Sequence, residues 1–221
     1  SGGARPKVMM EMDGEPWIIK FPAHVDRADI GKMEYDYYLC AEQCGITMSE
    51  CNLFPSDKCS GYFGTKRFDR KNQHGEMERV HMLTVAALLE LDFEQPVLDY
   101  QDLMKLTKII TNNSPEDLEN MYRRMCFNVY AHNRDDHAKN FSFLYEEEKK
   151  CWRLSPAYDL TYSTTYYGEH TTTVAGNGKN PGSKELIFVG TQAGLSKEKC
   201  RSIAVEIKNC VSDMLSEYLN P

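Results

Sequence analysis

Short apolar runs separated by turn residues dominate the first part of the chain. Residues 7–12 and 16–21 flank Asp13-Gly14-Glu15, which predicts two strands joined as a β-hairpin. Apolar residues then recur about every 3.6 positions over 29–45, which predicts a helix that ends at Gly45. We also expect strands at 52–54 and 59–67, followed by a polar stretch at 71–75 that ends this part.

Helical spacing of apolar residues is more frequent in the second part. Ser114 followed by Pro115 is an N-cap with proline at the first helical position, and it predicts a helix that reaches about Ala131. The last segment, 196–219, has apolar residues on one face and predicts an amphipathic helix. The remaining predictions are helical segments at 84–91 and 100–111, strands at 141–145 and 151–154, and a loop at 161–183.

This order of elements predicts an α+β fold with two lobes. A small β-rich N-lobe with one helix would occupy 1–70, and a larger, mostly helical C-lobe would occupy 71–221. The length of 221 residues is enough for either one large domain or two small lobes. A glycine-rich turn opens the chain with no strand before it, so we expect the fold to begin upstream.

Charge and hydropathy narrow the classes of function. The net charge is −7, which argues against direct nucleic-acid binding as the main role. No apolar run approaches the ~20 residues of a membrane span, and no signal peptide opens the chain. The sequence has eight cysteines, which we expect to be reduced thiols packed in a cytoplasmic protein. Cys40, Cys44, Cys51 and Cys59 lack the spacing of a zinc knuckle, and buried packing is the preferred interpretation.

The densest group of reactive side chains is Asn133–Asn140, between a predicted helix and a predicted strand. By itself it could be a solvated polar turn. Protein kinases, however, place a catalytic Asp and a metal-binding Asn five positions apart in such a loop, and Asp135 and Asn140 have that spacing. Asp159, after the predicted strand 151–154, stands where a kinase holds its second magnesium ligand.

Phosphoryl transfer also needs cations and backbone amides around the phosphates. Trp17-Ile18-Ile19-Lys20 resembles the kinase strand that ends in the ATP lysine, with Glu34 as its predicted acidic partner and Asp36 as the fallback. The turn of Gly2, Gly3 and Ala4 could cradle phosphates. Between the lobes, the backbones of Lys66 and Phe68 could meet the base and Asp69 the ribose; a salt-bridged strand end is the alternative.

Together, these motifs make the sequence similar to the HipA-like serine/threonine kinases of bacteria. The residues that carry the resemblance are Gly2–Lys7, Ile19–Pro22, Arg67–Arg70, Asp135–Ser142 and Pro156–Asp159, which follow the family order and span nearly the whole chain. The resemblance implies a two-lobed kinase-like fold and transfer of the ATP γ-phosphate to a protein hydroxyl. It implies Asp135 as catalytic base, Asn140 and Asp159 as Mg²⁺ ligands, and His137 and Lys139 as nucleotide contacts.

The resemblance also implies partners and regulation. Family members act as toxins of toxin–antitoxin pairs, their targets include aminoacyl-tRNA synthetases, and the antitoxin is usually a helix-turn-helix protein. They autophosphorylate a serine in the glycine-rich loop, where this sequence has only Ser1. The given sequence does not include the family's separate N-terminal subdomain, which we expect to have been removed or to be encoded as a second chain.

Three other functions use overlapping residues. A non-catalytic nucleotide-binding module would bind ATP without transfer. A lipid or small-molecule kinase would share the fold. A metal-dependent phosphohydrolase or nuclease would use Asp135, Asp136, His137 and Asp159 and would need neither Lys20 nor ATP.

Overall fold

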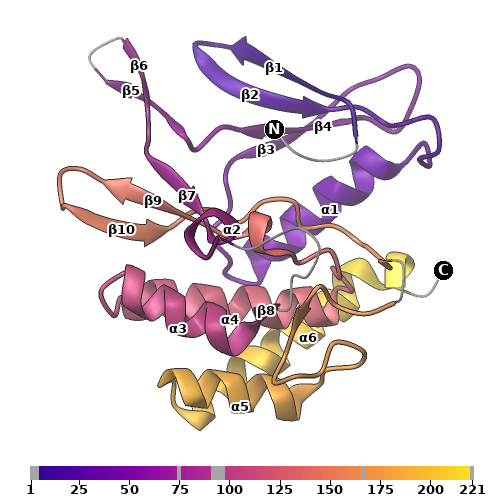
Figure 1. Ribbon diagram of the computed structural model, residues 1–221. Helices are drawn as coiled ribbons and strands as arrows, with labels where there is room; N and C mark the ends of the chain where they lie inside the picture. The colour runs from indigo at the N-terminus through magenta and orange to yellow at the C-terminus, as the bar shows by residue number, and fades with distance from the viewer. Residues whose placement is uncertain (1–4, 74–75, 91–97, 166–167, 220–221) are drawn as a thin grey trace.

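A four-stranded antiparallel sheet forms one end of the molecule (Figure 1). The computed structural model describes residues 5–73, 76–90, 98–165 and 168–219. The predicted hairpin is confirmed, with Lys7 directly opposite Lys20. In spatial order the strands are β1 (Lys7–Met12), β2 (Glu15–Lys20), β4 (Tyr62–Lys66) and β3 (Cys51–Phe54).

Helix α1 (Ile30–Gln43) packs against this sheet and also against the last helix of the chain. Gly31 allows the close approach to the sheet, because a Cβ at this position would lie 2.2 Å from the carbonyl oxygen of Gly61. The predicted end of the helix is confirmed: Gly45 follows it with φ of 69°, a left-handed conformation that favours glycine.

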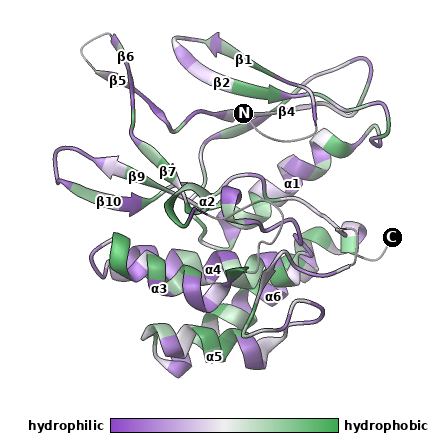
Figure 2. Cartoon of the chain, in the orientation of Figure 1, coloured by the Kyte–Doolittle hydropathy of each residue, from purple (hydrophilic) through white to green (hydrophobic). Residues whose placement is uncertain are grey.

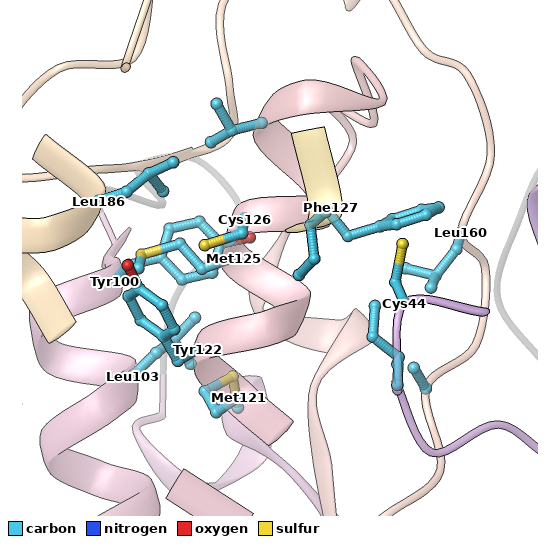
Figure 3. Packing of buried hydrophobic residues seen from close by; sticks show 14 of the residues in the cluster. Cys44, Tyr100, Leu103, Met121, Tyr122, Met125, Cys126, Phe127, Leu160 and Leu186 are labelled. Atoms are coloured by element: carbon cyan, nitrogen blue, oxygen red, sulfur yellow. The ribbon is translucent and has the colours of Figure 1, made fainter. Parts of the chain in front are cut away.

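Four helices make up most of the other lobe and contain the main core. They are α3 (Tyr100–Ile110), α4 (Pro115–Tyr130), α5 (Ser183–Ala193) and α6 (Lys197–Leu219). The Ser114 side chain accepts a hydrogen bond from the Asp117 amide, which confirms the predicted N-cap of α4. Figure 3 shows Tyr122, Met125 and Phe127 of α4 within this core, and Figure 2 shows apolar residues along the helices.

Smaller elements connect the lobes and frame the loops. A three-stranded sheet has the order β10 (Cys151–Leu154), β9 (Ser142–Glu146), β7 (Met82–Thr84). The remaining elements are the hairpin β5 (Arg70–Gln73) and β6 (Glu76–Arg79), the parallel pair β8 (Leu98–Asp99) and β11 (Thr172–Thr173), the short helix α2 (Val85–Leu88) and the 3₁₀ turn η1 (Ala138–Asn140).

The α+β, two-lobed prediction is confirmed, with three local corrections. The polar stretch 71–75 does not simply end the first part, because β5 and β6 pair there; their charged, exposed side chains have no apolar pattern to reveal them. The helix predicted over 84–91 is a single turn, α2. Helix α5 begins where the sequence predicted the end of a loop. The division into 1–70 and 71–221 stays a prediction.

Among the described residues, no helix is long and apolar enough to cross a membrane.

Candidate active site

Lys20, at the end of β2, is the centre of the candidate site. Its ammonium donates to a carboxylate oxygen of Glu34 on α1 at 2.5 Å, and it also contacts the carboxylate of Asp159. The fallback partner, Asp36, instead contacts Lys32 and the hydroxyl of Tyr218. Burial by itself would lower the pKa of Lys20, but the two carboxylates outweigh it and raise the pKa above its ordinary value. Lys20 therefore stays cationic at neutral pH.

Asp159 lies in the loop after β10 with a left-handed backbone, at φ of 54°. Such a conformation is uncommon for residues other than glycine, although Asp adopts it more readily than most. Burial alone would raise the pKa of this carboxyl, but Lys20, with a smaller contribution from Lys7, holds the pKa below its usual range. The side chain is still 41% exposed, so it remains open to a ligand from solvent.

The loop between α4 and β9 carries the other predicted catalytic residues. Asp135 is 60% exposed, and a carboxylate oxygen lies 3.8 Å from Nε2 of His137. The amide group of Asn140 donates to the backbone carbonyl of Asp135 at 2.8 Å, which leaves the Asn140 side-chain oxygen as an acceptor. This hydrogen bond holds together the predicted catalytic base and the predicted metal ligand.

Buried hydrogen bonds of Asp136 hold this loop to other parts of the chain. Its carboxylate accepts hydrogen bonds from the Tyr100 hydroxyl at 2.9 Å and the Thr172 amide at 3.1 Å, and it lies 3.0 Å from Nδ1 of His170. The side chain is fully buried. Because both oxygens have partners, Asp136 is not available to a metal ion, which argues against the phosphohydrolase alternative.

The surroundings of Asp135 raise its pKa. Burial, followed by the nearby carboxylates of Asp136 and Asp159, raises the pKa of Asp135, and His137 opposes this shift. Because the charge of Asp159 contributes to the pKa of Asp135, the catalytic loop lies within electrostatic range of the Lys20 cluster. A direct connection also exists, since the Tyr158 hydroxyl donates to the Lys139 carbonyl at 2.7 Å.

A small pocket lies between the lobes beside Lys20 and Asp159. Residues from the sheet, from α1 and from the loop after β10 line it: Lys20, Glu34, Tyr38, Met48, Cys51, Phe63, Thr65, Ala157, Tyr158, Asp159 and Leu160. Its walls are mostly apolar, and Lys20, Glu34 and Asp159 supply the charges. Such a pocket, with a few converging polar groups, is typical of a ligand site.

The residues predicted to contact the nucleoside are only partly consistent with that role. The amide of Lys66 donates to the Glu50 carbonyl at 2.8 Å, so this donor is not available to a base. Asp69 accepts from Arg67 at 2.9 and 2.7 Å and from Arg70 at 2.8 Å, which matches the salt-bridge alternative. Phe68 packs against Tyr158, with ring centroids 5.6 Å apart, and so lies next to the site.

The remaining residues predicted to contact ATP are the glycine-rich turn, His137 and Lys139. Gly2, Gly3 and Ala4 lie outside the described residues. His137 has its Nδ1 buried with no hydrogen-bond partner among the residues that the structure describes. Lys139 is exposed.

Sequence reasoning missed two features of the site. The sequence placed Lys7 in the glycine-rich segment and at the start of a strand, but not at the site. It shares a sheet face with Lys20, because directly paired residues point the same way. The Asp13-Gly14 turn set this register and could have revealed it. The pairing of Asp136 with His170 had no sequence signal, since the two residues are 34 positions apart.

This arrangement defines a class of protein. The sheet lobe carries a lysine–glutamate pair, and the helical lobe presents a loop aspartate and a second acidic residue. This is the two-lobed protein-kinase-like fold. The family model of the HipA-like C-terminal domain matches residues 1–214, and the chain belongs to this family.

One named relative and two solved structures are also similar to this chain. The chain is 28% identical over 175 residues to the protein named Putative kinase Y4dM of Sinorhizobium fredii, covering 73% of this chain. The fold is similar to that of HipA of Shewanella oneidensis MR-1, solved with HipB and operator DNA, at 17% identity and a TM-score of 0.77 over 99% of this chain. It is also similar to the proinflammatory kinase CtkA of Helicobacter pylori, at 13% identity and a TM-score of 0.62 over 96% of this chain.

The chain differs in length from two of these proteins. It spans 41% of Y4dM and 57% of the HipA chain, but 93% of the CtkA chain.

Proposed function

We propose that this chain is an ATP- and Mg²⁺-dependent serine/threonine protein kinase of the HipA-like toxin type. The observation that carries the proposal is the contact of Lys20 with both Glu34 and Asp159, which are 14 and 139 positions away in the sequence. Kinases use a lysine–glutamate pair next to a metal-binding aspartate to hold the triphosphate. A lysine that served only as a surface cation would not need two carboxylates from separate lobes.

The donor set fits a hard cation. Asp159 offers a carboxylate and Asn140 an amide oxygen, which are ligands that Mg²⁺ prefers. When bound there, Mg²⁺ would neutralise charge on the phosphate oxygens. Lys20 would bind the α- and β-phosphates, and Glu34 would hold the lysine in place.

Asp135 would act on the acceptor hydroxyl. It is exposed, and the hydrogen bond from Asn140 to its backbone carbonyl holds the loop in shape. As a carboxylate, it would accept the hydroxyl proton or align the hydroxyl for attack. His137 and Lys139 lie on the same loop and would contact the nucleotide.

The nucleoside end of ATP would lie toward the connection between the lobes. The Phe68 backbone would meet the base there, and Gly2, Gly3 and Ala4 would cradle the phosphates through their amides. Lys7, opposite Lys20, would be a second cation for the triphosphate.

The substrate and partners follow from the family. We propose a protein substrate, with an aminoacyl-tRNA synthetase as the first class to test. A helix-turn-helix antitoxin would be the partner, with an N-terminal subdomain on a separate chain, and DNA contact would be left to the antitoxin. The HipA relative was solved with HipB and its operator DNA. We further propose that the protein acts in the bacterial cytoplasm.

The test is transfer of radiolabelled γ-phosphate from ATP to proteins of a bacterial lysate. The Asp135→Asn variant should lose about 100- to 10,000-fold in transfer rate, while its affinity for ATP with Mg²⁺ in calorimetry stays close to wild type. Asp57→Asn, at an exposed position away from the site, is the matched control and should keep full transfer.

Each alternative has its own outcome in this test. Wild-type protein that binds ATP and labels no protein would support the non-catalytic module. Label in lipid headgroups rather than protein would support the lipid kinase. Transfer by Asp135→Asn at the wild-type rate would contradict the assignment of the catalytic base.

A further inference from the structure

Three cysteine sulfurs meet where α1 packs on α6, on the side of α1 away from the sheet. Cys40 lies in the last turn of α1, Cys44 directly follows the helix, and Cys210 faces them from α6. The three sulfur atoms lie within 4.8 Å of one another, and those of Cys40 and Cys210 are 3.9 Å apart.

A fourth sulfur extends the cluster toward solvent. The thioether of Met214 lies 3.7 Å from the sulfur of Cys210, one turn further along α6. Cys40 and Cys44 are fully buried, whereas Cys210 is partly exposed and Met214 is 40% exposed. The cluster therefore has a buried end and an open end, and an ion could enter past Met214.

The sulfur spacing suits a single metal ion. Three sulfurs at about 2.3 Å from one ion in a plane are about 4.0 Å from one another. The separation of Cys40 and Cys210 already has this value, and the remaining pairs need only small side-chain movements. Helical proteins build metal sites from pairs of ligands about one turn apart on facing segments. Here Cys40 and Cys44 form one pair, and Cys210 and Met214 form the other.

We propose that Cys40, Cys44 and Cys210 form a binding site for one Cu⁺ ion, with Met214 as an outer fourth ligand. Thiolate and thioether sulfur favour soft metal centres, of which Cu⁺ and Zn²⁺ are the single ions. Zn²⁺ prefers four strong ligands, and no histidine or fourth cysteine joins the cluster within the described residues.

The charges around the cluster are mixed but favour a cation. Glu206 lies near Cys44, and Asp213 lies near Cys210. Arg123 opposes them in part, because it contacts Glu206 at 3.2 Å and the Cys44 carbonyl at 2.9 Å.

Two of the three thiols, those of Cys44 and Cys210, have a raised pKa. A contact with Cys40, followed by burial, raises the pKa of Cys44, and burial raises the pKa of Cys210 to about 11. Binding must therefore release thiol protons to solvent.

Copper retention by the full chain tests the site. The protein, kept reduced and free of oxygen, is titrated with Cu⁺ in the presence of bicinchoninate as a coloured competitor. Wild-type protein should retain one equivalent of Cu⁺, and X-ray absorption should report sulfur ligands only. Cys210→Ser should lower the affinity by at least about 100-fold, since even outer-shell changes cost about 10- to 100-fold.

Controls separate a metal site from simple packing of thiols. Cys59→Ser changes a partly exposed cysteine outside the cluster and should retain the full equivalent. Met214→Leu preserves the apolar packing and should weaken binding by about 10-fold or less, which gives a second variant if Cys210→Ser fails to fold. Melting of each metal-free variant, followed by circular dichroism, checks the fold.

The outcomes are distinct from those of the kinase test. Asp135→Asn should bind the same equivalent of Cu⁺, because the site does not use the catalytic loop. The proposal is overturned if wild-type protein yields all of its Cu⁺ to the competitor, if Cys59→Ser loses as much as Cys210→Ser, or if Zn²⁺ is retained and Cu⁺ is not.

Discussion

The ammonium of Lys20 lies 2.5 Å from the carboxylate of Glu34 and so ties strand β2 to helix α1. Their side chains are only 13% and 5% exposed, which makes this a buried pair. Two buried charges are costly to separate, since either one alone would be left without a partner. The pair therefore has consequences for stability as well as for nucleotide binding.

Removing one charge of this pair should destabilise the fold strongly. Lys20→Met should lower the free energy of unfolding by about 3 kcal/mol or more, because Glu34 would remain buried as an unpaired carboxylate. Urea denaturation measures the change. The double variant with Glu34→Gln should recover part of the loss.

The exposed pair on the same helix provides the matched control. Lys32 pairs with Asp36 one turn away, and its side chain is 46% exposed. Lys32→Met should cost about 1 kcal/mol or less. If Lys20→Met and Lys32→Met lowered the free energy of unfolding equally, burial would not be the reason for the strength of the Lys20–Glu34 pair.

The pH dependence of phosphoryl transfer should report on Asp135. A carboxylate base works only when deprotonated, so the rate should rise with pH through the pKa of Asp135, which burial and neighbouring carboxylates raise above the usual value. His137 lowers this pKa, so His137→Gln should move the acid limb of the profile to higher pH. Transfer rates of both proteins, measured from roughly pH 4 to 8, test this shift of the acid limb, because that range spans ordinary and raised carboxyl pKa values. A shift to lower pH would contradict the predicted sign.

Lys7 should contribute to nucleotide affinity. It pairs directly with Lys20 across the hairpin and lowers the pKa of Asp159, so its charge acts at the site. Lys7→Ala should weaken ATP binding by about 10- to 100-fold, the range expected for a hydrogen bond to a charged group. Calorimetry measures the affinity, and Lys71→Ala, an exposed lysine on β5, should leave it unchanged.

Asp136 should act by positioning the catalytic loop. Its buried carboxylate holds the loop to His170 and Tyr100, on separate parts of the chain. Asp136→Asn should lower kcat with little change in the KM for ATP, since the loop would move while the Lys20 cluster stays intact. Tyr100→Phe removes only one of the partners of Asp136, together with the hydrogen bond that the hydroxyl accepts from Asn128, and should have a smaller effect. A change confined to KM would contradict this role.

Local structure was largely predictable because local interactions determine it. The Ser114-Pro115 pair predicted the start of α4, and Gly45 predicted the end of α1. The β5–β6 hairpin escaped prediction because its exposed, charged strands leave no apolar pattern. The sequence could not predict that α2 is so short, because the apolar run 84–91 fits either a buried helix or a strand.

The candidate site was predictable to the extent that its residues lie in ordered motifs. The spacing of Asp135 and Asn140 and the strand that ends in Lys20 are both visible in the sequence. The roles of Lys66 and Asp69 were harder to predict. Whether a backbone amide or a carboxylate at a strand end can bind a ligand depends on the groups that surround it in the folded chain. The structure gives the Lys66 amide and the Asp69 carboxylate partners within the protein.

The sequence by itself determined the order of the motifs, the two kinds of lobe and the types of side chain that the chemistry needs. Only the tertiary structure decided which of these side chains meet. Lys20 reaches Asp159 across 139 positions, Asp136 reaches His170 across 34, and Cys40 reaches Cys210 across 170. Such contacts depend on how the lobes and helices pack, and no local pattern of residues encodes the distance between segments so far apart in the chain.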